Sequence, residues 1–167
     1  MSSMVYLMCS LPSLTYGQVP PISLDEFNAD AQKQLSKKHF KALEAVDIRQ
    51  MDGQTKDLSK KSIRDMLSEV QEDLLEIRKA RSENRQPKLE RLSNVAIAAN
   101  PLEREKQIMQ SQWEELSSIE AGKTFTLTEV MVYKLKLQIL SRVHSFNAEQ
   151  GAQVLASVVD PSIKDED

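Results

Sequence analysis

The side chains that could carry out acid–base or metal chemistry are few and scattered. The chain has two histidines, His39 and His144, and one cysteine, Cys9. Neither histidine has a cysteine or carboxylate at the helical spacing that a zinc motif such as HExxH requires. Ordinary surface or hydrogen-bonded histidines are therefore the better interpretation. Cys9 stands in an apolar run without a basic neighbour, so we expect a buried, unreactive thiol.

Carboxylates and glycines give no stronger signal of catalysis. Acidic pairs such as Glu114 with Glu115 alternate with Lys, Arg and Gln, which is typical of a solvated helix face. A di-iron bundle needs Glu-x-x-His on two helices, and this motif is absent from the sequence. The phosphate-binding patterns GxGxxG and GxxxxGK[ST] are absent too. We therefore expect no enzyme activity, no cofactor, no metal and no small-molecule substrate.

One charge asymmetry remains, in residues 78–91. Six basic and two acidic side chains give this segment a local charge of +4. A solvated helix end is its ordinary role, and an acidic protein, RNA or an acidic lipid surface is the functional alternative. No aromatic residue is interleaved for base stacking, which argues against nucleic acid as the partner. The candidate partner-binding residues are Arg78, Lys79, Arg81, Arg85, Lys88 and Arg91.

Trp113 is a further partner-binding candidate. Tryptophan is enriched at protein interfaces. A single tryptophan at helical spacing is more often a core residue, so both interpretations stay open.

The composition indicates what kind of molecule carries these residues. Of 167 residues, 40% are apolar and 28% charged, with a net charge of −3. This is the size and composition of one domain with a real core. Only four glycines occur, too few for a turn-rich β domain. The near-neutral balance argues against a dedicated nucleic-acid binder, and the single cysteine fits a reducing compartment.

The apolar N-terminus, residues 1–14, could be mistaken for a signal peptide. No Lys or Arg precedes Lys33, Pro12 breaks the apolar run, and Met8 is larger than the small residue that a cleavage site needs. No stretch approaches the roughly 18 apolar residues of a membrane span. We expect a cytoplasmic protein that reaches the inner membrane only through its partners.

Start signals divide the rest of the chain into helices. Ser23 with Glu26 and Thr126 with Glu129 form capping boxes, and Asn100 is a cap followed by proline at the first helical position. Continuous apolarity suggests a short extended segment at residues 4–11. The predicted helices span residues 24–35, 37–49, 58–84, 101–121, 127–146 and 147–159, the last capped at Asn147.

Breaks between these helices are also marked. Asp52-Gly53 is a turn signal, Gly122 ends one helix, and Asp160-Pro161 ends the last. An apolar seam of coiled-coil spacing runs along helix 58–84 at Ile63, Leu67, Val70, Leu74 and Ile77.

Helix 127–146 is apolar nearly all round, which is typical of the middle of a bundle. The sequence therefore predicts an all-α bundle of five or six helices with a short extended N-terminal segment. Residues 1–159 form a single domain, and residues 160–167 form a disordered acidic tail.

Two stretches carry a resemblance to a known family. Residues 5–27, VYLMCSLPSLTYGQVPPISLDEF, combine Ser-Leu-Pro, an aromatic-Gly pair and Pro-Pro-x-Ser before a helix. Residues 100–151 combine a tryptophan-containing helix, a phenylalanine before the next cap and Tyr-x-Leu-Lys-Leu-Gln-Ile. Both resemble a bacterial family encoded beside V-type (V/A-type) rotary ATP synthases. The middle segment, residues 36–99, shows no such likeness.

The resemblance implies a role like that of the C-type (or d-type) component of these enzymes, the helical socket between the rotor shaft and the membrane ring. This chain is too short to form the whole socket. We therefore expect a non-catalytic subunit, accessory or assembly protein that binds other V-type ATPase subunits. The alternative is a stand-alone helical adaptor or regulatory protein that contacts nucleic acid through residues 78–91. Binding that falls steeply with salt would favour the alternative.

Overall fold

The computed structural model describes residues 3–48, 58–89 and 100–164. These ranges contain six helices and no strand, so the predicted all-α bundle is confirmed. The turn predicted at Asp52-Gly53 lies outside the described residues. The helices are α1 (Ser3–Ser10), α2 (Leu24–Gln34), α3 (Lys37–Glu44), α4 (Leu58–Ser82), α5 (Pro101–Glu120) and α6 (Leu127–Lys164).

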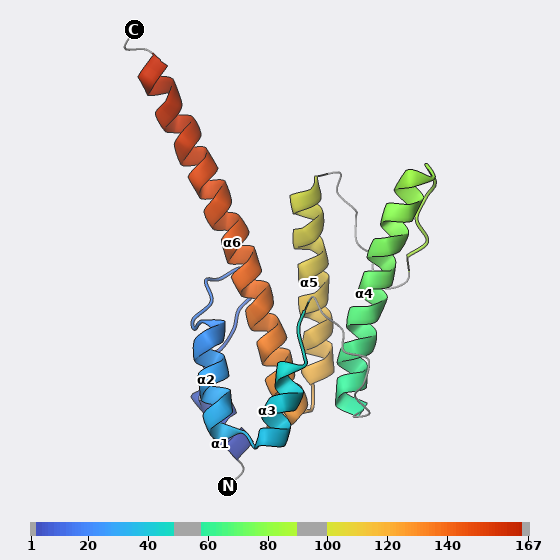
Figure 1. The fold of residues 1–167 in the computed structure, drawn as a ribbon, viewed down its shortest axis with the longest axis vertical. Helices are drawn as coiled ribbons and strands as arrows, with labels where there is room; N and C mark the ends of the chain where they lie inside the picture. The colour runs from blue at the N-terminus through green and yellow to red at the C-terminus, as the bar shows by residue number, and fades with distance from the viewer. Residues whose placement is uncertain (1–2, 49–57, 90–99, 165–167) are drawn as a thin grey trace.

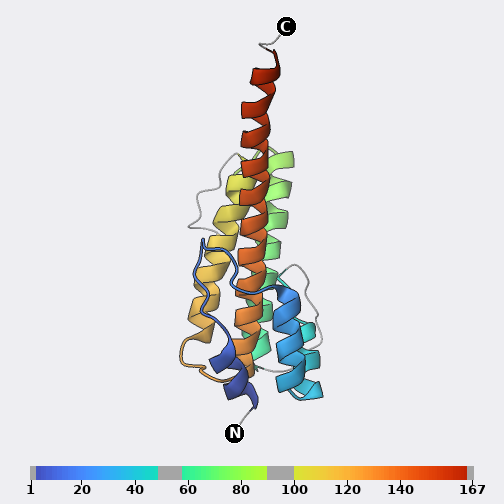
Figure 2. The same cartoon turned by 90° about the vertical axis from the view of Figure 1, so that its left-hand side faces the viewer.

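Helix α6 is the axis of the molecule. Each of the other five described helices packs against it, and α5 does so along the greatest length. Helices α1, α2 and α3 surround its first half, while α4 lies on the far side of α5 (Figure 1). The C-terminal turns of α6 extend beyond the other drawn helices in both views (Figure 2).

The start signals at Ser23 and Asn100 act as the sequence predicts, and the capping box predicted at Thr126 forms only in part. Ser23 and Glu26 form a complete capping box at α2. Asn100 caps α5 by accepting from the amide of Leu102, 3.0 Å away. At α6 the Thr126 hydroxyl accepts a hydrogen bond from the amide of Glu129. The carboxylate of Glu129 accepts from the amide of Phe125 and not, as a capping box requires, from the amide of Thr126. These contacts use backbone donors that the first helical turn leaves unpaired.

The buried side chains show which helix faces form the core. In α6, the apolar side chains from Val130 to Leu140 are buried on all sides, as expected of a central helix. The predicted seam of α4 also faces the core, with Ile63, Leu67, Val70 and Ile77 buried and Leu74 half-buried.

The buried part of α6 also carries polar side chains that have partners. Lys134 donates from Nζ to the carbonyl oxygen of Leu43 at 2.9 Å. Gln138, one turn later, accepts from the amide of Ile48 and donates to Asp47. Burial lowers the pKa of Lys134, while the nearby Asp47 and a glutamate of α3 oppose that shift. Lys134 and Gln138 therefore fasten the end of α3 to α6.

The N-terminal segment is fastened in the same way. Tyr133 of α6 donates from its hydroxyl to the carbonyl oxygen of Pro12 at 2.7 Å, and its ring stacks on Phe27 of α2 with centroids 5.4 Å apart. Burial raises the pKa of Tyr133 to about 12. Residues 11–23 thus run as a strap across α6, from α1 to α2.

Two N-terminal predictions were wrong. The segment at residues 4–11 is the helix α1, not an extended strand. Met4 and Leu7 face the core at helical spacing, whereas Cys9 is exposed and not the buried thiol we expected. An apolar run of eight residues is compatible with a strand or with a helix. Here the run forms a helix, whose apolar side packs against α2 and α6.

The predicted helix ends are wrong in two places. Helix α3 ends at Glu44 rather than near residue 49. Helix α6 is continuous from Leu127 to Lys164, so Asn147 does not cap a separate helix and Asp160-Pro161 does not end it. Residues 160–164 are therefore helical and not a disordered tail. A helix that has already formed extends readily, because adding a residue avoids the cost of nucleation.

The central position of α6 gives a stability prediction. Leu137 and Leu140 are 0% and 1% exposed, so truncation of either to alanine should lower the free energy of unfolding by about 2–5 kcal/mol. Urea denaturation followed by circular dichroism at a fixed protein concentration measures this. Leu75, which is 61% exposed on α4, is the control, and Leu75→Ala should change stability by less than about 0.5 kcal/mol. Equal effects at both sites would contradict a central α6.

Candidate partner-binding site

The basic segment does not project from the body as a free arm. Helix α4 ends in a Schellman motif, with Asn84 in the left-handed region at φ 53°. The amide of Arg85 donates to the carbonyl oxygen of Ala80, and the amide of Asn84 donates to that of Arg81. The chain is thereby turned back along α4. We call residues 83–89 the hook.

An ion pair holds the hook against α4. The guanidinium of Arg85 contacts both carboxylate oxygens of Glu76, at 2.5 and 3.3 Å, and contacts Glu83 at 2.5 Å. The amide of Lys88 also donates to Glu76. The bond from Arg85, followed by that from Lys88, lowers the pKa of Glu76 to about 2. The same pairing raises the pKa of Arg85.

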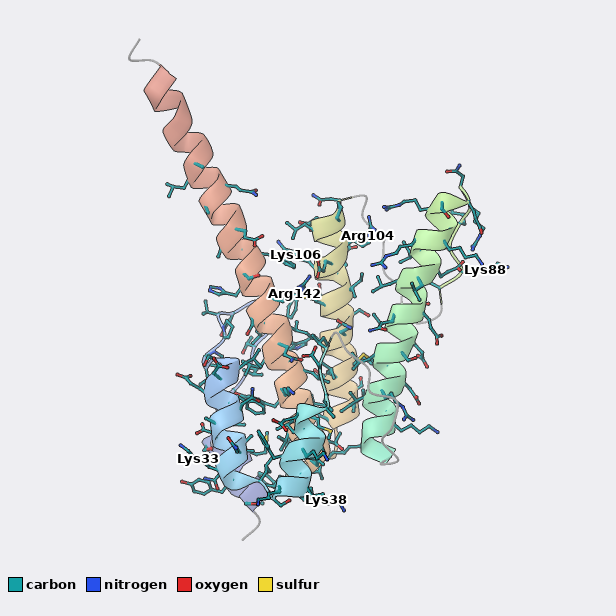
Figure 3. The ribbon with its side chains drawn as sticks, viewed as in Figure 1. Lys33, Lys38, Lys88, Arg104, Lys106 and Arg142 are labelled. Atoms are coloured by element: carbon teal, nitrogen blue, oxygen red, sulfur yellow. The ribbon has the colours of Figure 1, made fainter. Side chains whose placement is uncertain are left out.

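The six basic candidate residues differ in their surroundings and in their partners. Arg85 has two carboxylate partners, so its charge is largely neutralised within the chain. Lys79 and Arg81 are exposed in the last turn of α4, and Lys88 is exposed on the hook (Figure 3). Arg78 lines a cleft described below. Arg91 lies outside the described residues.

Trp113 is half-buried and held from two sides. Tyr16 of the N-terminal strap meets its ring edge to face, with centroids 5.5 Å apart. The Nζ atom of Lys136 lies 4.9 Å from the ring centroid and forms an ion pair with Glu120 at 2.7 Å. Burial, followed by the charge of Glu114, raises the pKa of Tyr16. These contacts give Trp113 a structural role in fixing the strap.

A cleft that could receive a partner lies between α4 and α5, with α6 at its base, and has a volume of about 580 Å³. This volume is in the range of ordinary ligand sites. Its apolar wall is made by Leu67, Val70 and Leu74 of α4, Ile108 and Met109 of α5, and Ile139 of α6. Its polar residues include Gln71, Arg78, Arg104, Glu105, Gln112 and Arg142.

Three arginines from three helices meet at this cleft. The side chains that line the cleft include these three arginines and one glutamate, and Arg142 forms an ion pair with that glutamate, Glu105. The sequence analysis did not identify this site. The seam of α4 was visible in the sequence, but Leu67 and Val70 are buried in the structure and only Leu74 of the seam is half-buried. The cleft depends on the relative placement of three helices.

Other chemistry is not indicated in the described part of the chain. No group of three or more His, Cys, Asp or Glu side chains there could hold a metal ion. Within the same residues, no helix is long and apolar enough to cross a membrane.

Comparison with known proteins adds one finding. Residues 67–166 match the model of a family described as "Protein of unknown function (DUF2764)". The chain belongs to this family. No curated protein and no solved structure matches it. The DUF2764 match covers most of α4 and all of α5 and α6, and therefore nearly the whole cleft, whereas α1, α2 and α3 lie outside it.

The hook gives a prediction of pH dependence. The pKa of Glu76 is lowered from about 4.5 to about 2 in the folded chain, so its ion pair stabilises the hook above about pH 4.5 and is lost as the pH falls toward 2. An NMR titration of the Glu76 carboxyl should give a midpoint near 2. In Arg85→Ala the midpoint should rise toward the ordinary value, while Arg81→Ala should leave it unchanged. A wild-type midpoint near 4.5 would show that the hook is open in solution.

The strap gives a spectroscopic prediction. Trp113 is the single tryptophan of the chain, and Tyr16 covers one side of it. Tyr16→Ala should shift the fluorescence emission to longer wavelength, because the indole gains contact with water, and should lower stability by about 1 kcal/mol. Tyr6, 60% exposed on α1, is the matched control, and Tyr6→Ala should leave the emission unchanged. Identical spectra for all three proteins would place the strap elsewhere in solution.

Proposed function

We propose that this chain is a non-catalytic subunit, accessory or assembly protein of a V-type rotary ATP synthase, acting through protein–protein contacts. The observation that carries the proposal is the cleft between α4, α5 and α6, which combines an apolar wall with an arginine rim. Such a surface suits an amphipathic helix that has acidic residues beside its apolar face. The partner we propose is therefore an acidic helix of another protein of the ATPase.

The position of the two family-like stretches supports the assignment. Residues 5–27 and 100–151 are far apart in the sequence, yet they lie against each other in the fold. Tyr16 contacts Trp113, and Pro12 accepts from Tyr133. The stretches that carry the resemblance thus form one packed unit, to which α4 adds the outer wall of the cleft.

A nucleic-acid adaptor is the weaker candidate. Its predicted contact surface was residues 78–91, and Arg85 in that segment is already paired with Glu76 and Glu83. An arginine held in this way offers little charge to a phosphate backbone.

Co-purification from native membranes, followed by mass spectrometry, tests the proposal. The wild-type chain should recover subunits of the V-type ATPase. Arg78→Glu places a negative charge on the cleft and should reduce recovery roughly tenfold, because like charges on the two surfaces slow association. Lys79→Glu makes the same charge change at the next residue, which does not line the cleft, and should retain near wild-type recovery.

The possible results separate the two parts of the proposal. Recovery of no ATPase subunit by the wild-type chain would overturn the assignment. Equal recovery by wild type and both variants would keep the assignment and exclude the cleft as the contact.

A further inference from the structure

One end of the molecule is rich in lysine. Three segments lie there, at the lower end in both views: helix α1, residues 31–43 around the turn from α2 to α3, and the connection 121–126 from α5 to α6 (Figures 1 and 2). Together they contain no Asp or Glu and five lysines, which are Lys33, Lys37, Lys38, Lys41 and Lys123. We call these three segments the lysine end.

The lysines of α2 and α3 have no carboxylate partner. Lys33, Lys37, Lys38 and Lys41 are all exposed, and Figure 3 labels Lys33 and Lys38 at this end. Within the described residues none of the four forms an ion pair. The nearest carboxylate along α2 is that of Asp30, one turn before Lys33. Four cationic groups therefore face solvent together.

Two of these lysines stand where a helix favours the opposite charge. Helix α3 is capped by Ser36, and its first two residues are Lys37 and Lys38, with no acidic residue in the first turn. The start of a helix carries a partial positive charge, so carboxylates stabilise it and ammonium groups do not. An anion bound at the lysine end would offset this unfavourable placement.

Exposed aromatic side chains lie at the same end. Tyr6 of α1 is 60% exposed and Phe125 of the α5–α6 connection is 42% exposed. They are the only aromatic members among the exposed large apolar residues of the described chain. Phe125 has φ 60°, an unfavourable backbone conformation for a bulky residue, and its amide donates to Glu129. Strain of this kind is common where a side chain contacts a ligand.

We infer that the lysine end binds the surface of an anionic lipid bilayer. Lysines near such a surface are attracted to its phosphate headgroups. Tyrosine and other aromatic side chains favour the boundary between headgroups and acyl chains. The uncharged α1 between them lets the surface approach without burying a charge. From the sequence we expected membrane contact only through partners, and this inference adds a direct one.

The kind of cation favours lipid over nucleic acid. The three segments contain lysine only and no arginine. Arginine, with its planar fork of donors, is the preferred group for nucleic-acid recognition, whereas lysine acts as a point charge. A lipid headgroup layer needs only point charges over a broad area.

The charge of the rest of the chain orients the contact. The whole chain carries −3, so the residues outside the lysine end sum to −8. At the start of α4, Lys61 and Asp65 are both exposed and offset each other. An anionic surface therefore repels most of the molecule and attracts this end.

The cleft stays open in this orientation. Arg104 and Arg142, which line it, are drawn well away from Lys33 and Lys38 (Figure 3). The inference does not depend on the ATPase assignment, because it requires only the purified chain and vesicles. Failed co-purification with ATPase subunits would leave it standing, and failed vesicle binding would leave the proposed function untouched.

Vesicle co-sedimentation of the purified full-length chain tests the inference. The vesicles are pure phosphatidylcholine or phosphatidylcholine with about one third phosphatidylglycerol, at about 50 mM salt, where screening is weak. We expect binding to the anionic vesicles to be at least tenfold tighter than to the neutral ones. It should weaken as salt is raised, because the charges are exposed.

A pair of matched double variants locates the contact. Each lysine contributes about fivefold to affinity, so Lys37→Gln with Lys38→Gln should weaken binding roughly 25-fold. The same variant should melt no earlier than wild type by circular dichroism, because both lysines are at a helix start. Lys79→Gln with Lys88→Gln makes the same change at two exposed lysines near the other end of α4 and should leave affinity within about twofold.

The aromatic contribution has its own control. Tyr6→Ala should weaken binding to the anionic vesicles roughly threefold, because binding strength grows with the apolar area buried at the interface. Leu75→Ala removes a side chain of similar exposure from α4 and should leave binding unchanged.

Four results would overturn the inference. They are no binding to anionic vesicles at low salt, equal binding to neutral vesicles, equal loss in the two double variants, and a preference for RNA. The last is measured with poly(U) RNA in the same buffer. Binding to it at least tenfold tighter than to the vesicles, lost in the Lys37→Gln, Lys38→Gln variant, would assign the lysine end to nucleic acid.

Discussion

The burial of polar side chains in the first half of α6 is the constraint on which the rest of the fold depends. Lys134 and Lys136 are buried and Gln138 is half-buried, and the three alternate with buried apolar residues. A buried ammonium or amide without a partner is strongly destabilising. The neighbours of α6 therefore have to present an oxygen at each of these positions, in addition to filling space.

Each polar side chain fixes a different neighbour. Lys134 and Gln138 are one turn apart and hold the end of α3 and the residues after it. Lys136 points to the other side, where Glu120 of α5 and Trp113 receive it. Helix packing alone would allow several arrangements of equal burial, and these contacts select one of them.

The sequence predicted those parts of the fold that depend on neighbours within one turn. The caps at Ser23 and Asn100 are local hydrogen bonds, and the structure contains both. The seam of α4 and the central place of α6 follow from the spacing of apolar residues. Of the candidate residues, Lys79 and Arg81 lie exposed as a basic helix end should.

Features that depend on distant packing or on helix continuity could not be predicted. The N-terminal run fits strand and helix equally well, and its contact with α2 and α6 decides between them. The signals at Asn147 and Pro161 compete with a helix that is already nucleated, so they do not end it. The hook depends on Asn84 adopting positive φ, which brings Arg85 to Glu76, and no spacing rule indicates that pair. The cleft requires the relative placement of three helices.

The strap carries a consequence for biosynthesis. Pro12 is held by Tyr133, 121 positions later, and Leu43 by Lys134, 91 positions later. Contacts of such long range form late. On the ribosome, at about 5–20 residues per second, the N-terminal helices wait roughly 6–24 s for Tyr133 to be made. During that interval Leu7 and Phe27, which are fully buried in the finished protein, have no core to enter. The nascent chain is thus a natural client for a chaperone that covers apolar segments until α6 emerges.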